Sequence, residues 1–97
     1  MFVFHIVIQV MIPVLQPLNP KAKVVVHHYF LFNINIRDRK FQVLDSWRTL
    51  NDKSLKDCVD RLKATSLILW DEGYSKSKVQ LEQFRTEEIN VPKQITK

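Results

Sequence analysis

The amino-acid sequence predicts an α+β domain in which antiparallel strands belong to a mixed sheet and a helix packs on that sheet. Apolar residues alternate with other residues in parts of the first half of the chain, which is typical of strands, and recur at helical spacing after Lys53. The 97 residues suit a single folding unit, and 45% hydrophobic and 26% charged residues are ordinary for a chain that buries a core.

The first apolar segment runs from Phe2 to Leu15 and is rich in valine, isoleucine and phenylalanine. These residue types favour one or two buried strands, and Pro13 limits the pairing of the strand that contains it. A membrane span needs about 20 apolar residues, and a secretory signal needs a basic start and a small-residue cleavage site. The segment meets neither condition, so we expect no membrane partner. A polar loop broken by prolines, Gln16 to Lys23, follows it.

A β-hairpin is predicted next, with strands from Val24 to Ile36 and from Phe41 to Leu44 joined by a charged connection. The returning strand brings its end beside the start of the first strand. Asp45 should therefore lie beside His28, where a carboxylate can hold an imidazole in one tautomer and stabilise its protonated form. His27 should point to the opposite face of the strand.

A helix is predicted from Ser54 to about Trp70, with Ser54 and Asp57 as a weak capping box. Its apolar face should consist of residues at helical spacing: Leu55, Cys58, Val59, Leu62, Ser66 and Leu69. A loop should follow to Lys78. The segment from Val79 to Phe84 fits either a short helix or a connector, and Glu87 to Val91 is expected to lead into a last strand.

Composition excludes several classes of function. The single cysteine, Cys58, cannot form an intramolecular disulfide, which favours an intracellular protein. The net charge of +5 comes from scattered lysines and arginines, so no nucleic-acid partner is expected. The three histidines and one cysteine lack zinc-ligand spacing, and we expect neither a metal nor a cofactor.

The stretch from His28 to Ser46 resembles the ubiquitin-like-protein-specific, or SUMO-type, cysteine proteases. In that family a strand begins with His-Trp and returns, after a basic turn, to an Asp-Ser pair, as Asp45-Ser46 does here. Ile12-Pro13-Val14 resembles the strand that precedes the histidine strand, and Val91 to Gln94 resembles the segment whose glutamine lines the oxyanion hole. The resemblance covers residues 12–97, and residues 1–11 lie outside it.

This resemblance implies that residues 1–97 form a single partial papain-like cysteine protease domain, with His28, Asp45 and Gln94 as its catalytic residues. Tyr29 stands where the family usually has tryptophan. The family's nucleophile lies in an Asp-Cys-Gly segment after the glutamine, which is expected beyond Lys97. Cys58 falls in the apolar face of the predicted helix, where a structural role is expected instead.

Two functions remain open. The chain could be part of an enzyme that cleaves SUMO or another ubiquitin-like protein from its conjugates, in the nucleus or the cytoplasm. Alternatively, it could be an inactive remnant or a non-enzymatic module that binds a ubiquitin-like protein, because a triad without its nucleophile forms no acyl-enzyme. The 97 residues alone are expected to be inactive, and the sequence does not indicate an oligomeric state.

Overall fold

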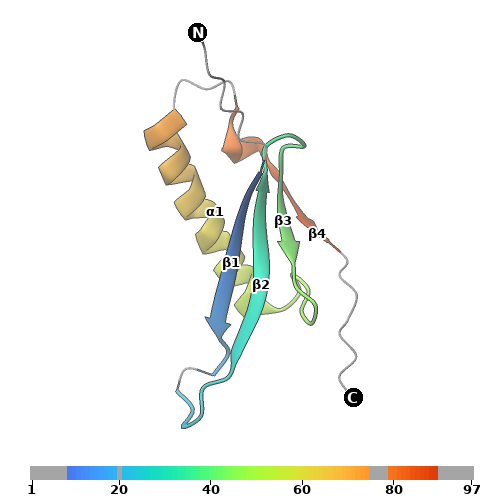
Figure 1. Cartoon of the computed structure of the whole chain (residues 1–97), viewed down its shortest axis with the longest axis vertical. Helices are drawn as coiled ribbons and strands as arrows, with labels where there is room; N and C mark the ends of the chain where they lie inside the picture. The colour runs from blue at the N-terminus through green and yellow to red at the C-terminus, as the bar shows by residue number, and fades with distance from the viewer. Residues whose placement is uncertain (1–8, 20, 75–78, 90–97) are drawn as a thin grey trace.

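The computed structural model describes residues 9–19, 21–74 and 79–89. Within these residues the elements follow one another as β1 (Gln9–Pro17), β2 (His27–Asn35), β3 (Lys40–Leu44), α1 (Lys53–Tyr74), the 3-10 turn η1 (Leu81–Gln83) and β4 (Arg85–Glu88). Figure 1 shows the strands side by side, with α1 running along the sheet. No helix in the described ranges has the length and apolar character needed to cross a membrane.

The sheet has the strand order β1-β2-β3-β4. β2 pairs antiparallel with β1 and β3, whereas β3 pairs parallel with β4, so the sheet is mixed. The predicted hairpin is therefore present, and Ile34 lies opposite Phe41 in its register. These features confirm the expected α+β arrangement of a mixed sheet with a packed helix.

The core lies between α1 and one face of the sheet. In β2, the residues whose side chains point toward the helix alternate with residues that point away, as the period of a strand requires. The buried apolar side chains come from β2, β3, α1 and the segment around η1: Phe30, Phe32, Ile34, Phe41, Val43, Leu55, Val59, Leu81 and Phe84. A single layer of apolar side chains thus joins the helix to the central strands.

β1 is less buried than the sequence predicted. It lies at the edge of the sheet, where Met11 is 57% and Leu15 is 63% exposed, while Ile12 and Val14 pack against the core. The helix covers only one face of the strand, so alternate side chains remain in solvent. Pro13 fits this position, because an edge strand tolerates a residue without a backbone N–H.

The start of β2 was also predicted wrongly. The strand begins at His27, and Val24 is 75% exposed in the connection before it. The Asn19 side chain donates to the carbonyl of Val24 at 2.9 Å and accepts from the backbone N–H of Val26. These hydrogen bonds close a loop and override the strand preference of the valines.

Asp52, rather than Ser54, caps α1. The backbone N–H of Leu55 donates to Asp52 Oδ1 at 3.0 Å, and the helix begins at Lys53. This is the geometry of an N-cap side chain, which typically contributes about 1 kcal/mol to helix stability. The apolar face predicted from spacing holds for Leu55 and Val59, which are fully buried.

The end of the helix differs from the prediction as well. α1 continues past Trp70 to Tyr74, and Leu69 is 61% exposed. Leu67 and Trp70 pack against the core at this end, and the indole N–H of Trp70 donates to the carbonyl of Val79 at 3.0 Å. The segment after the helix therefore covers the side that carries Trp70 and leaves Leu69 in solvent.

The ambiguous segment from Val79 to Phe84 contains the 3-10 turn η1, and Phe84 is buried in the core. The last predicted strand begins earlier than expected, since β4 spans Arg85–Glu88. Ile89, the next residue of the predicted strand, lies after the end of β4, and residues 90 and 91 lie outside the described residues.

Candidate active site

The candidate site is built around His28 and Asp45, at the end of the β2–β3 hairpin. His28 shares the helix-facing side of β2 with Phe30 and is only 6% exposed. Leu31 pairs with Leu44, so the chain leaves β3 at Asp45 and reaches back toward the start of β2. His28 Nε2 lies 2.8 Å from Asp45 Oδ1. The contact predicted from the sequence is therefore present.

His27 is exposed, in agreement with its predicted position on the other face of β2. Among the described residues, no hydrogen bond joins His27 to Asp45. The two adjacent histidines are thus clearly distinguished by their surroundings, which makes His27 a natural control for substitutions at His28.

The Asp45 carboxylate is the centre of a dense hydrogen-bond cluster. Its side chain is 1% exposed. Besides the His28 ring, the backbone N–H groups of Trp47 and Arg48 donate to Oδ1, each at 2.9 Å, and Arg48 Nε donates to Oδ2 at 2.9 Å. The carboxylate therefore receives donors on both oxygens.

These contacts keep the carboxylate charged. Burial by itself disfavours the ionised form, but the hydrogen bonds from the backbone of Trp47 and Arg48, and then from the side chains of His28 and Arg48, outweigh it and hold the pKa of Asp45 below its ordinary value. An ionised carboxylate only accepts hydrogen bonds, so His28 Nε2 must carry the proton in their contact. In the neutral ring, Nδ1 then keeps the lone pair that a general base needs.

The depressed pKa of Asp45 predicts an acid-dependent loss of stability. A carboxyl group that is more acidic in the folded chain stabilises the fold above its unfolded pKa, and this contribution disappears as the pH falls through the folded pKa. The free energy of unfolding should therefore decrease as the pH is lowered from about 5 toward 2. Urea unfolding at a series of pH values measures this slope, which should be shallower in Asp45→Asn and unchanged in the exposed control Asp71→Asn.

Trp47 forms one side of the site. Its ring centroid lies 4.9 Å from that of His28, with an interplanar angle of 33°, and the side chain is 67% exposed. Trp47 thus lies at the surface rather than in the core. Tyr29, the next residue after His28, lies on the strand face opposite His28 and is 54% exposed.

Sequence reasoning missed Arg48. Its side chain is 9% exposed and connects Asp45 to Gln16 on β1, because Nη1 donates to Gln16 Oε1 at 2.9 Å. Gln16 Nε2 in turn donates to Ser54 Oγ at 3.0 Å, at the start of α1. The spacing of Asp45 and Arg48 could have suggested their ion pair, whereas the link to Gln16 depends on tertiary structure.

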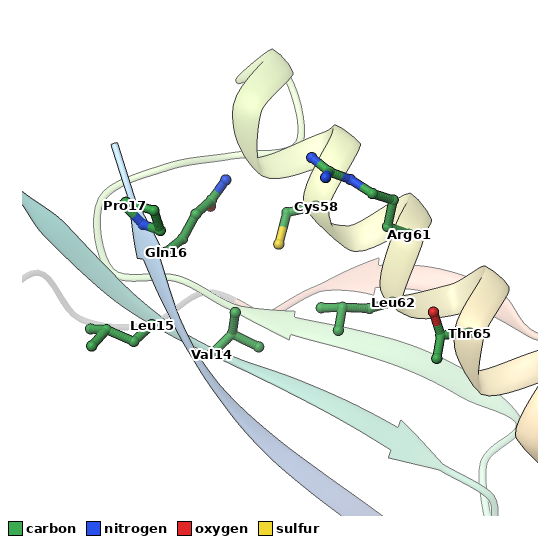
Figure 2. Close-up of a pocket in the computed structure, with 8 residues that line it drawn as sticks. All are labelled: Val14, Leu15, Gln16, Pro17, Cys58, Arg61, Leu62 and Thr65. Carbon is green, nitrogen blue, oxygen red and sulfur yellow. The ribbon is translucent and has the colours of Figure 1, made fainter. Parts of the chain in front are cut away.

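Gln94 and Cys58 are the other two residues that the sequence analysis considered for catalysis. Gln94, the expected oxyanion-hole residue, lies outside the described residues. Cys58 lies on α1 and lines a cavity of about 510 Å³ between this helix and β1. Figure 2 shows its sulfur facing the space between the two elements, and neither His28 nor Asp45 lines that cavity. Among the described residues, no hydrogen bond joins Cys58 to His28 or Asp45.

The arrangement provides a buried, oriented imidazole and an ionised partner, which are the means to move one proton. It provides no nucleophile beside the imidazole within the described residues. In those residues no group of three or more histidine, cysteine, aspartate or glutamate side chains is placed to hold a metal ion. Comparison with protein-family models, with curated proteins and with solved structures found no match to the chain.

Proposed function

We propose that this chain supplies the acid–base pair of a cysteine peptidase that releases SUMO or another ubiquitin-like protein from its conjugates. The supporting observation is the 2.8 Å contact between His28 Nε2 and Asp45 Oδ1, inside a cluster that keeps the carboxylate charged. A second support is the resemblance to the ubiquitin-like proteases, in which the histidine, aspartate and glutamine follow one another in the same order as His28, Asp45 and Gln94. The chain would then form part of a papain-like domain. The protein would act in the nucleus or the cytoplasm.

In the proposed reaction, His28 Nδ1 takes the proton of a cysteine thiol, and the thiolate attacks the carbonyl carbon of the substrate's C-terminal glycine. A thioester forms as the bond from that carbon to the amine nitrogen breaks. The Asp45 carboxylate stabilises the resulting imidazolium. Gln94 would donate to the oxyanion, as the resemblance implies. The imidazolium then protonates the departing amine, and a water molecule deprotonated by His28 hydrolyses the thioester.

The substrate class fits the surface beside His28. Trp47 offers an exposed aromatic face next to the imidazole. A glycine tail has no side chains, so its backbone can approach such a flat surface closely. Ubiquitin-like proteins that end in glycine would present such a tail to the site.

The nucleophile in this proposal is not Cys58, which faces the cavity between β1 and α1. The test therefore compares the 97-residue chain with a polypeptide continued by the genomic sequence that follows Lys97. Only the continued polypeptide should be labelled by SUMO or ubiquitin carrying a C-terminal electrophile, and Cys58→Ala should leave this labelling unchanged. A following sequence without Asp-Cys-Gly would contradict the proposal, as would cleavage by the 97 residues that is lost in Cys58→Ala.

A non-enzymatic role is the second candidate, favoured because no nucleophilic side chain within the described residues forms a hydrogen bond with the His28 ring. In that case the continued polypeptide would bind a ubiquitin-like protein without forming a covalent adduct. Binding measured by calorimetry, with labelling measured in parallel, separates the two functions.

A further inference from the structure

We propose that Arg48 is a positioning residue of this site: it fixes the Asp45 carboxylate in the orientation that presents Oδ1 to His28, and Gln16 anchors Arg48 for this purpose. Its catalytic meaning rests on the function proposed above. The geometry itself is a property of the 97-residue chain and can be tested without activity.

The two oxygens of Asp45 have different partners. Arg48 Nε binds Oδ2 at 2.9 Å, whereas His28 Nε2 binds Oδ1 at 2.8 Å. The backbone donors of Trp47 and Arg48 also reach only Oδ1. Among the described residues, Arg48 is therefore the side chain that holds Oδ2. Without it the carboxylate plane is less restricted about the Cβ–Cγ bond, and its tilt away from His28 Nε2 would weaken the hydrogen bond that favours the Nε2–H tautomer.

Arg48 is itself held from several sides. Nη1 donates to Gln16 Oε1 at 2.9 Å, and the guanidinium carbon lies 5.5 Å from the centroid of the Phe30 ring. Gln16 is tied to Ser54 at the start of α1. Arginine suits this role because its donors project in a fixed planar fork, whereas a lysine ammonium is a point charge on a flexible stem.

The remaining nitrogen, Nη2, is buried and has no hydrogen-bond partner among the residues that the structure describes. A buried donor without a partner is destabilising, and the exceptions in native structures often have a functional reason. The guanidinium thus keeps its contacts to Asp45 and Gln16 although one of its own donors is unsatisfied. This pattern favours a role in placing Asp45 over a role in stability alone.

The experiment reads the His28 ring directly. Nitrogen-15 NMR of the histidine rings distinguishes the tautomer protonated at Nε2 from the one protonated at Nδ1, and His28→Ala assigns the signals. In the unaltered chain, His28 should show the Nε2–H tautomer. Arg48→Met and the milder Gln16→Leu should shift its signals toward a mixture of tautomers. Arg48→Lys should restore the Nε2–H form only in part.

Arg61→Met is the matched control, since Arg61 is exposed on α1 and, within the described part of the chain, donates only to the backbone carbonyl of Asp57. It should leave the His28 signals unchanged, and the exposed His27 ring serves as an internal reference in every variant. If Arg48→Met unfolds the chain, Gln16→Leu still decides the question. An unchanged His28 tautomer in a folded Arg48→Met or in Gln16→Leu would overturn the inference. Peptidase assays are not part of this test, so its outcome is separate from that of the proposed function.

Discussion

Under the proposed function, His28→Ala in a polypeptide continued to the proposed nucleophile is expected to lower kcat/KM for a SUMO C-terminal amide by about 10⁴-fold or more, the order of loss seen when a catalytic triad loses one member. The physical reason is the loss of the group that takes the proton of the thiol and returns it to the leaving amine. Continuous release of the fluorescent amine by wild type and variant measures the ratio.

His27→Ala is the matched control. It removes the same side chain one position earlier in β2, from a residue that is exposed rather than held by Asp45. Its kcat/KM should stay near that of the unaltered enzyme. A large loss in His27→Ala with full activity in His28→Ala would show that the residue assignment is wrong.

Phe32→Ala should cause the largest loss of stability, about 3–5 kcal/mol of unfolding free energy. Phe32 is 0% exposed and stacks on Phe41 with ring centroids 5.6 Å apart. The substitution removes a whole ring from the layer between sheet and helix and leaves a cavity. Domains are typically stable by only about 5–15 kcal/mol, so this loss removes a large share of the total free energy of unfolding. Urea denaturation followed by circular dichroism measures the difference.

Leu69→Ala is the control for this substitution. Spacing in the sequence predicted Leu69 to belong to the apolar face of the helix, but it is 61% exposed. Its replacement should change the unfolding free energy by less than about 0.5 kcal/mol, as is usual for surface sites. Equal losses in the two variants would contradict the packing described above.

The sequence predicted the hairpin and the contact of His28 with Asp45 because both follow from local rules. Side chains alternate along a strand, and a short connection returns the second strand beside the first. These rules already separate His28 from His27. They require no knowledge of the remaining chain.

Arg48 and Gln16 were not predicted because their contacts depend on how the edge strand β1 and the start of α1 meet the end of the hairpin. The spacing of apolar residues along the sequence does not reveal these contacts between separate elements. The start of β2 was misplaced for a related reason. The Asn19 side chain binds backbone groups of Val24 and Val26 that would otherwise be available for hydrogen bonds between strands. Tertiary and side-chain contacts decided these points against propensity.

The Asp45 cluster also has a consequence for when the acid–base pair becomes functional during folding. Its members come from β1, β2, the segment after β3 and the start of α1, so the chain must close several loops before all of them meet. Contacts between distant parts of a sequence form slowly compared with a single helical turn. In a nascent or partly folded chain, the His28 imidazole would therefore lack some of the hydrogen bonds of the Asp45 cluster. Proton transfer by this pair would begin only once the domain is assembled, and under the proposed function this would restrict proteolysis to the folded protein.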